Sequence, residues 1–123
     1  MILKSALMCL ALTVYYEARG EPEIGQYAVT EVVMNRVIDR KLTVCEVIKQ
    51  PKQFSWVSTW NHKIPSGQDW DKSVKIAETV LNGKTTNYSN NALYFRHKGV
   101  KGRMASSIII GNHIFYRTSK GKA

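Results

Sequence analysis

The sequence predicts an α+β fold, with a mostly helical body and a small antiparallel β-sheet near the C-terminus. In several segments before Leu81, hydrophobic residues recur at three- and four-residue steps, which is the period of helices that bury one face. From Ala92 onward, β-branched and aromatic residues form short runs separated by glycine-containing turns, as is typical of strands. A length of 123 residues fits one domain, so we expect 1–123 to share a single core.

The first helix is predicted from the segment Met1–Val14 and should end before Gly20 and Pro22. Its buried stripe comprises Leu3, Leu7, Leu10 and Val14. The segment superficially resembles a signal peptide, but polar residues interrupt the apolar run and no small-residue cleavage site is visible. It is also too short to span a bilayer. We therefore interpret it as a helix of the folded domain.

Further helices are predicted from about Glu23 to Asp39, from Thr43 to Lys49 and from Trp70 to Leu81. The apolar stripe of the longest one comprises Ala28, Val29, Val32 and Val33. Pro51 stops the short helix, and Asn82-Gly83 ends the last one.

Two kinds of non-helical segment remain. Gln53–Pro65 is rich in aromatic residues but has neither the helical nor the strand period, so it is predicted to be a loop. The predicted strands are Leu93–Phe95, Ile108–Ile110 and Ile114–Tyr116.

The formal net charge of +9 is unevenly distributed. Every acidic residue lies at or before Glu78, so the last third of the chain is purely basic. The cationic residues after Glu78 are Lys84, Arg96, Lys98, Lys101, Arg103, Arg117, Lys120 and Lys122. Such a segment attracts polyanions, and charge alone leaves nucleic acid, anionic lipid and an anionic cell wall as alternatives.

Cys9 and Cys45 lack the spacing of a metal or redox motif. Both lie among apolar neighbours, so the simpler interpretation is a pair of small buried hydrophobic residues. A disulfide is the alternative, and it requires maturation outside the cytoplasm.

Glu17 is the first candidate for chemistry. It follows Val14 by three residues and Leu10 by seven, so it flanks the buried stripe of the first helix. Burial beside apolar groups raises the pKa of a carboxyl, which suits a general acid near neutral pH. A solvated glutamate at a helix end, or one paired with Arg19, is the alternative.

The loop that begins at Gln53 has a composition suited to ligand binding. Phe54 and Trp56 offer aromatic faces, while Gln53 and Ser55 offer hydrogen-bonding groups for the hydroxyl and acetamido groups of sugars. Nucleobases stack on aromatic rings in the same way, and both rings could instead be core residues beneath a loop.

Gly111–Tyr116 is the third candidate segment. Strand alternation places His113 and Tyr116 on opposite faces, and a lone histidine is more often structural than catalytic. The other histidines are His62 and His97. Their spacing matches no metal-binding motif, so we expect neither a metal site nor a cofactor.

Several blocks of sequence, taken in order, resemble the spore cortex-lytic cell wall hydrolases of the SleB type. The blocks are Tyr16–Glu21, Gly25–Val29, Val33–Val37, Thr43–Ile48, Gln53–Trp56, Ala92–Phe95 and Gly111–Tyr116. Together they extend over almost the whole chain, from about Cys9 to Arg117. Any one block is weak evidence, but their order makes the resemblance specific.

The resemblance implies a lysozyme-like fold and cleavage of the bond between N-acetylmuramic acid and N-acetylglucosamine in peptidoglycan. It assigns catalysis to Glu17. The residues expected to bind the substrate are Gln53, Ser55, Trp56, Tyr94, His113 and Tyr116. Glu21 matches the second glutamate of the motif, and we expect it to hold Arg19 or a backbone turn.

Ordinary glycosidases place a second carboxylate across the scissile bond. Outside the cluster Glu17–Glu23 the sequence offers no obvious second carboxylate, which favours the lytic transglycosylase route, in which one glutamate acts first as acid and then as base. Glu31, Glu46 or Asp69 could approach in space, so a hydrolytic muramidase is the alternative.

The chain is expected to be a stand-alone catalytic domain, without a signal peptide or a wall-binding domain, and to act as a monomeric phage or prophage endolysin. Such a protein would be made in the host cytoplasm and reach the periplasmic wall at lysis, with its basic last third attracted to the anionic envelope. A nucleic-acid-binding module is the rival hypothesis, but it leaves the Glu17 motif unexplained, so no nucleic acid partner is expected.

Overall fold

The computed structural model describes residues 5–99 and 107–117. The helices are α1 (Ala6–Ala18), α2 (Glu23–Arg40), α3 (Val44–Lys49), α4 (Trp56–Thr59) and α5 (Gln68–Leu81). The strands are β1 (Tyr94–His97), β2 (Ile108–Ile110) and β3 (His113–Tyr116). A helical body followed by a small antiparallel sheet is therefore confirmed. No helix in these two ranges is both long and apolar enough to cross a membrane.

Helix α1 begins at a capped position and runs beyond the predicted stripe. The Ser5 hydroxyl accepts a hydrogen bond from the Met8 N–H at 3.2 Å, which satisfies one of the free donors of the first turn. Residues 1–4 of the predicted helix lie outside the described residues. Leu10 and Val14 have no exposed surface, as expected. The helix ends at Ala18 and thus carries the Glu17 motif on its last turn.

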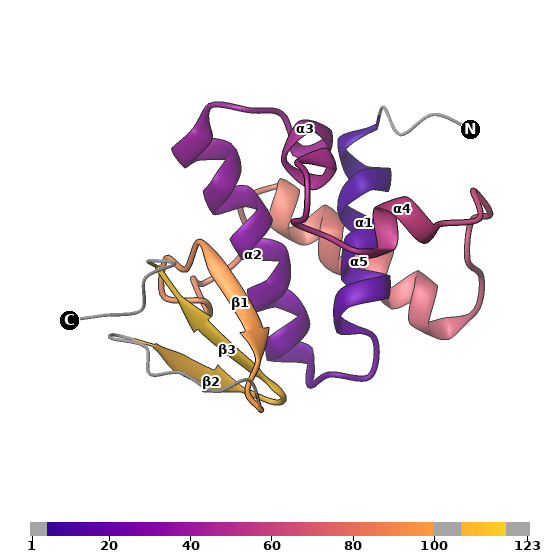
Figure 1. Ribbon diagram of the computed structural model, residues 1–123. Coiled ribbons are helices and arrows are strands. Elements are labelled where there is room, and N and C mark those ends of the chain that lie inside the picture. Colours follow the sequence, from indigo (N-terminus) through magenta and orange to yellow (C-terminus); the bar gives the residue numbers. More distant parts are fainter. Residues whose placement is uncertain (1–4, 100–106, 118–123) are drawn as a thin grey trace.

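Helix α2 joins the two parts of the fold. Figure 1 shows it with the sheet on one side and the other helices on the opposite side, and it packs against α1, α3, α5 and β1. Val33 belongs to the hydrophobic cluster formed by the helices. Val29 and Val32 belong to a second cluster, which includes Phe115 of β3. The predicted stripe of α2 therefore supplies both clusters.

The sheet has the strand order β1-β3-β2, with both pairs antiparallel. The register pairs Tyr94 with Tyr116 and His97 with His113. His113 contacts the ring of Phe95, while Tyr116 stacks on Tyr94, so the predicted alternation of faces is confirmed.

One short helix departs from the prediction. Gln53–Pro65 was expected to be a loop throughout, but α4 occupies Trp56–Thr59. A single helical turn is too short to display a period, and isolated turns are unstable without tertiary contacts. Here the Ser58 and Thr59 hydroxyls donate to the Ser55 carbonyl, and Trp56 is buried.

The cysteines also depart from the simpler interpretation. Cys9 of α1 and Cys45 of α3 form a disulfide, with their Cα atoms 5.5 Å apart. Both are buried within the helical cluster, so the expectation of burial holds while the expectation of two unbonded thiols is wrong. The bond ties the first helix to the segment that precedes the aromatic loop.

Candidate active site

Glu17 lies on the last turn of α1, where the two hydrophobic clusters meet. Tyr15 packs against the cluster formed by the helices, whereas Ala18 belongs to the cluster beneath the sheet. The Glu17 side chain between them is half-buried. The sequence pattern placed Glu17 beside the buried stripe, and the structure confirms that position.

The environment of Glu17 favours its protonated form. Burial raises the pKa of this carboxyl, and the positive charge of Arg36 opposes the rise without cancelling it. The alternative partner, Arg19, is engaged elsewhere: its guanidinium lies 4.4 Å from the ring centroid of Tyr15 and donates to the Tyr15 hydroxyl. Glu17 therefore keeps its proton to a higher pH than a solvated glutamate does.

Arg36 of α2 brings a positive charge into the interior near Glu17. It is only 4% exposed, and its Nε donates to the Leu93 carbonyl at 2.6 Å. Its guanidinium lies 5.4 Å from the ring centroids of both Phe54 and Tyr94. Burial lowers the pKa of Arg36 to about 10, which leaves the side chain charged at neutral pH.

The two tyrosines predicted from the strands form a stacked pair beside Arg36. The ring centroids of Tyr94 and Tyr116 are 5.5 Å apart, and their planes are inclined by 18°. The guanidinium groups of Arg40 and Arg96 each lie 5.9 Å from one ring of this pair. We call Arg36, Arg40, Arg96, Tyr94 and Tyr116 the arginine–tyrosine cluster. The sheet thus brings two predicted site residues to the arginine that acts on Glu17.

Trp56 packs on the residue next to Glu17. Its ring stacks on Tyr16, with centroids 5.4 Å apart, and meets Trp60 edge-on at 6.0 Å. Because Trp56 is only 5% exposed and Tyr116 only 9%, neither ring offers an open face to a sugar. For Trp56 this burial fits the alternative of a core residue beneath the loop, and the roles of Trp56 and Tyr116 in substrate binding stay predictions. Tyr16, which is 40% exposed, presents an aromatic surface beside Glu17 instead.

Gln53 and Ser55 are exposed on either side of the buried Phe54. Ser55 lines a pocket of about 300 Å³ between α3 and α4. The other residues that line it are Ile48, Lys49, Gln50, Pro51, Lys52, Phe54, Val57 and Ser58. These residues do not include Glu17, so no described contact places Ser55 against the catalytic candidate. The substrate-binding roles of Gln53 and Ser55 stay predictions.

Glu21 holds the turn between β2 and β3. Its two carboxylate oxygens accept hydrogen bonds from the Asn112 backbone N–H at 2.9 Å and from the Asn112 side chain at 3.0 Å. Burial alone would raise the pKa of Glu21, but these hydrogen bonds, with the charges of His113 and His97, outweigh it and lower the pKa. Of the two expected roles, the backbone turn is the one observed.

Gly111 allows this contact. A Cβ at this position would collide with Glu21 Oε1 and lie 2.7 Å from Cδ of Pro22, and Gly111 has a φ of +59°, which L side chains rarely adopt. The turn can approach Glu21 only because residue 111 has no side chain.

His113 is a neighbour of this turn and is not among the residues that surround Arg36. Its Nδ1 lies 3.9 Å from Glu21 Oε1, and its ring meets Phe95 edge-on at 5.1 Å. Burial lowers the pKa of His113, against the opposing charge of Glu21. These contacts fit the structural interpretation of a lone histidine, and a role in substrate binding stays a prediction.

No described contact joins Glu17 to the other carboxylates that were named as its possible partners. Glu31 is buried and accepts hydrogen bonds from the Ser89 N–H at 2.7 Å and from the Thr85 hydroxyl. Glu46 closes the capping box of α3 with Thr43. A third, Asp69, lies in the exposed first turn of α5.

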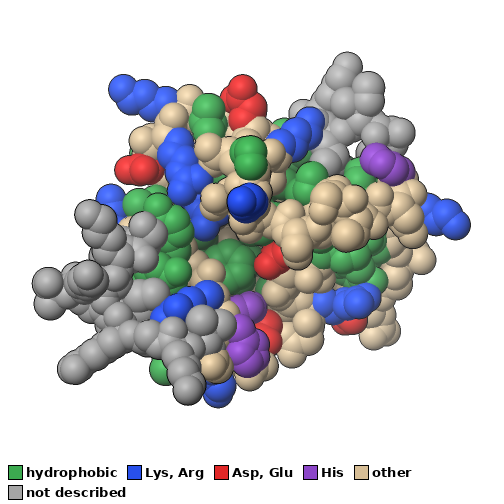
Figure 2. Space-filling view, in the orientation of Figure 1, with side chains coloured by type: hydrophobic (Ala, Val, Ile, Leu, Met, Phe, Trp, Pro, Cys, Tyr) green, Lys and Arg blue, Asp and Glu red, His purple; other side chains and the backbone are tan. Residues whose placement is uncertain are grey.

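Figure 2 shows a hollow near the centre of the face that Figure 1 presents. Hydrophobic side chains form its floor, an acidic side chain lies beside it, and histidine and cationic side chains border it. Within 5–99 and 107–117, no group of three or more His, Cys, Asp or Glu residues could hold a metal ion. Around Glu17 the chemistry available is that of a carboxyl with a raised pKa, a cationic cluster and aromatic rings.

Two residues of this site were not chosen from the sequence. Arg36 occupies a position three residues after Val33 of the apolar stripe, and a charged residue there signals a buried, partnered cation. Tyr16 directly precedes Glu17, and this position was the available signal in the sequence.

Comparison with known proteins places this arrangement in a family. The model of the family described as Cell Wall Hydrolase matches residues 20–116, a range that begins just after Glu17. The spore cortex-lytic enzyme of Oceanobacillus iheyensis is 37% identical over 95 residues, which cover 72% of this chain and 31% of that protein. The spore cortex-lytic enzyme of Bacillus cereus is 35% identical over 91 residues, which cover 72% of this chain and 33% of that protein. The chain thus spans about a third of the length of these relatives.

Two solved structures resemble the fold over almost its whole length. The catalytic domain of the Bacillus cereus SleB protein has a TM-score of 0.73 and 32% identity, covering 91% of this chain and 89% of that one. The catalytic domain of the germination-specific lytic transglycosylase SleB from Bacillus anthracis has a TM-score of 0.72 and 31% identity, covering 95% and 99%. The expected lysozyme-like fold is confirmed by this likeness. From the sequence match and the shared fold together, the chain belongs to the cell wall hydrolase family.

Proposed function

We propose that this protein cleaves the glycan strands of peptidoglycan between N-acetylmuramic acid and N-acetylglucosamine, as a lytic transglycosylase. Glu17 is its catalytic acid and base. The observation that carries the proposal is the position of Glu17 on the last turn of α1, half-buried and with a raised pKa. A carboxyl of this kind holds the proton that the leaving oxygen needs.

In the first step, the Glu17 carboxyl donates its proton to the bridging oxygen, and the bond from that oxygen to C1 of N-acetylmuramic acid breaks. N-acetylglucosamine leaves with the proton as a free 4-hydroxyl. Positive charge develops on the ring of N-acetylmuramic acid, and Glu17 is now a carboxylate. The charge of Arg36, which lowers the pKa of Glu17, stabilises that carboxylate.

In the second step, the 6-hydroxyl of N-acetylmuramic acid attacks C1, and Glu17 accepts its proton. A 1,6-anhydro ring closes, no water is consumed, and Glu17 is protonated again for the next cycle. This route needs one carboxyl that changes roles, and it needs no second carboxylate across the scissile bond. Three other carboxylates already have structural partners, which supports this route. Glu21 holds a turn, Glu31 holds a loop and Glu46 caps a helix.

The same site could serve a hydrolytic muramidase if a water molecule replaced the 6-hydroxyl as the attacking group. Muropeptides released from purified peptidoglycan in water enriched with oxygen-18 distinguish the two reactions by mass. The transglycosylase product lacks one water and takes up no label. A labelled reducing end would overturn the transglycosylase proposal and establish the muramidase, and release of neither product would overturn glycan cleavage itself.

Action at the cell wall follows from this proposal, and an endolysin role remains a further prediction. It can be tested by expressing the chain in bacteria with and without a co-expressed protein that permeabilises the inner membrane. An endolysin lyses the cells only in the first case. Lysis that is equal in both cases would count against it.

A further inference from the structure

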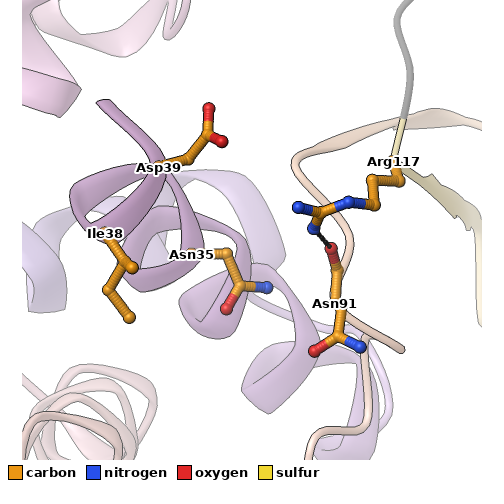
Figure 3. A pocket seen from close by; sticks show the side chains of 5 residues that line it. All are labelled: Asn35, Ile38, Asp39, Asn91 and Arg117. Atoms are coloured by element: carbon orange, nitrogen blue, oxygen red, sulfur yellow. Dashed lines mark hydrogen bonds between the residues drawn. The ribbon is translucent and has the colours of Figure 1, made fainter. Parts of the chain in front are cut away.

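A pocket lies on the flank of α2, apart from Glu17. It has a volume of about 230 Å³ and is lined by Asn35, Ile38, Asp39, Asn91 and Arg117. A single water needs on the order of 10–15 Å³ of such space, so the pocket can hold a polar group of several heavy atoms. Figure 3 shows that Asn35, Ile38 and Asp39 come from α2, while Asn91 and Arg117 lie on the opposite side of the pocket.

Opposite charges frame this pocket without neutralising each other. Asp39 has no hydrogen bond or ion pair with any residue in 5–99 or 107–117. Arg117 donates from Nη1 to the Asn91 carbonyl at 2.8 Å, which fixes one edge of the guanidinium and leaves its other N–H groups for a ligand. Figure 3 shows the carboxylate and the guanidinium across the pocket from each other.

The amides of the pocket are held in place by the fold. Asn35 donates from Nδ2 to the Ala92 carbonyl at 2.8 Å, so its Oδ1 is the atom left to accept a hydrogen bond. Asn91 has a φ of +62°, and its backbone N–H donates to Asn87 Oδ1 at 2.9 Å. A site whose polar groups are already positioned loses little entropy when it binds a ligand.

We propose that this pocket binds the zwitterionic end of a peptide stem of peptidoglycan, at the free α-amino acid head of a diamino acid. Asp39 takes the ammonium group, and the free N–H groups of Arg117 take the carboxylate. Asn35 and Asn91 complete the hydrogen bonds, while Ile38, which is 77% exposed, contacts the aliphatic chain of the ligand. A zwitterion matches the pocket because each charge meets its opposite, whereas a simple anion would face the Asp39 carboxylate.

This assignment rests on the proposed function, and the pocket is placed suitably for it. Asn35 and Arg36 are consecutive residues of α2, and they donate to the consecutive carbonyls of Ala92 and Leu93. The pocket therefore adjoins the arginine–tyrosine cluster that contains Arg36. An extended stem of four residues spans about 13 Å, so its end can bind well away from the sugar that carries it.

The test is binding of a soluble stem peptide, measured by calorimetry and by amide chemical shifts on the full chain. The probe is the tripeptide N-acetyl-L-alanyl-γ-D-glutamyl-meso-diaminopimelic acid, which carries no glycan and whose one free amine is that of the diamino acid. We expect shifts at Asn35, Ile38, Asn91 and Arg117. Acetylation of the free amine of the probe, Asp39→Asn and Arg117→Gln should each weaken binding at least tenfold. Glu78→Gln, which removes an exposed carboxylate on α5, is the matched control and should bind as the wild type does.

Binding that survives Asp39→Asn, or shifts confined to other surfaces, would overturn the proposal, as would the absence of binding at millimolar probe. Equal affinity for free glycine would overturn the assignment to a stem, because the rest of the peptide would then contribute nothing. The probe has no bond that Glu17 could cleave. Failure of stem binding and failure of glycan cleavage are therefore observed in separate experiments.

Discussion

The buried guanidinium of Arg36 lowers the pKa of Glu17, and it does so against the larger, opposite effect of burial. The two effects have different origins, because burial follows from the packing of α1 while the charge comes from α2. A general acid needs a pKa near the working pH, high enough to hold the proton and low enough to release it. Arg36 is therefore a positioning and tuning residue for Glu17 under the proposed mechanism.

Glu17→Gln is expected to reduce peptidoglycan cleavage by roughly 10²–10⁴-fold, the usual contribution of general acid–base catalysis. Glutamine keeps the volume of the side chain but has no proton to donate. Clearing of a peptidoglycan suspension gives the rate, and circular dichroism checks the fold. Glu23→Gln is the control, since Glu23 is exposed and makes only a surface ion pair with Lys72 at 3.6 Å. A folded Glu17→Gln protein with more than about a tenth of the wild-type rate would refute the assignment.

Arg36→Met is expected to shift the alkaline limb of the rate–pH profile to higher pH. Without the positive charge, Glu17 is subject to burial alone, so its pKa rises further and it stays protonated to a higher pH. Arg36→Lys keeps a charge at the position and should restore part of the wild-type limb. Thermal unfolding of both variants separates this effect from a loss of structure. An alkaline limb that stays in place in a folded Arg36→Met protein would show that the two groups are not coupled.

Gly111→Ala is expected to destabilise the fold by about 1–3 kcal/mol, the usual cost of forcing atoms into an occupied site. The new methyl group would collide with Glu21 Oε1 and with Pro22, and it would also sit at a positive φ. Gly83→Ala separates the two causes, because Gly83 has a φ of +71° and a Cβ added there would meet no heavy atom within 4 Å. Urea denaturation measures both variants. If Gly111→Ala and Gly83→Ala lower the free energy of unfolding equally, the collision with Glu21 does not contribute to the destabilisation.

Loss of the disulfide is expected to lower the free energy of unfolding by about 3–4 kcal/mol, because the bond closes a long loop in the unfolded chain. The sequence separation between Cys9 and Cys45 is 36 residues. The double variant Cys9→Ala/Cys45→Ala should unfold at lower urea concentration than the oxidised wild type. A reducing agent should destabilise the wild type and leave the double variant unchanged. Insensitivity of the wild type to reduction would argue that the two thiols are not bonded in solution.

The sequence pattern was sufficient where a residue's environment depends on its own element. Leu10 and Val14 are buried because they lie on one face of α1, and Glu17 follows from the same face. Alternation along β3 likewise predicted that His113 and Tyr116 lie on opposite faces of the sheet. These features repeat with the period of the local backbone, so a single segment predicts them.

The features that the pattern did not predict depend on contacts between distant segments. Trp56 could not be assigned to a core or to a binding surface, because its burial comes from packing on Tyr16 of α1. Arg36 is held by the Leu93 carbonyl and by rings from two other segments. The disulfide required that α1 and α3 be adjacent. No period within one segment encodes such distances.

The basic last third of the chain is predicted to assist lysis by long-range attraction without taking part in the chemistry. Of its cationic residues, Lys84, Lys98 and Arg117 are exposed, whereas Arg96 is half-buried beside Tyr116. The residues of this set that lie outside the described ranges are Lys101, Arg103, Lys120 and Lys122. The alternative is that these charges only keep the protein soluble.

Salt distinguishes the two explanations, because the screening length falls from about 10 Å at 0.1 M to about 3 Å at 1 M ionic strength. Cleavage of whole peptidoglycan should slow as salt rises, whereas cleavage of a short uncharged glycan should change much less. Substituting Lys98, Lys101 and Arg103 by Gln should flatten the salt dependence and preserve the rate that remains at high salt. The control removes the same charge from exposed positions earlier in the chain, at Lys41, Lys63 and Lys75. Two results would exclude long-range attraction by this segment. One is that both triple variants keep the wild-type salt profile, and the other is that salt slows cleavage of both substrates equally. In either case the solubility explanation stands.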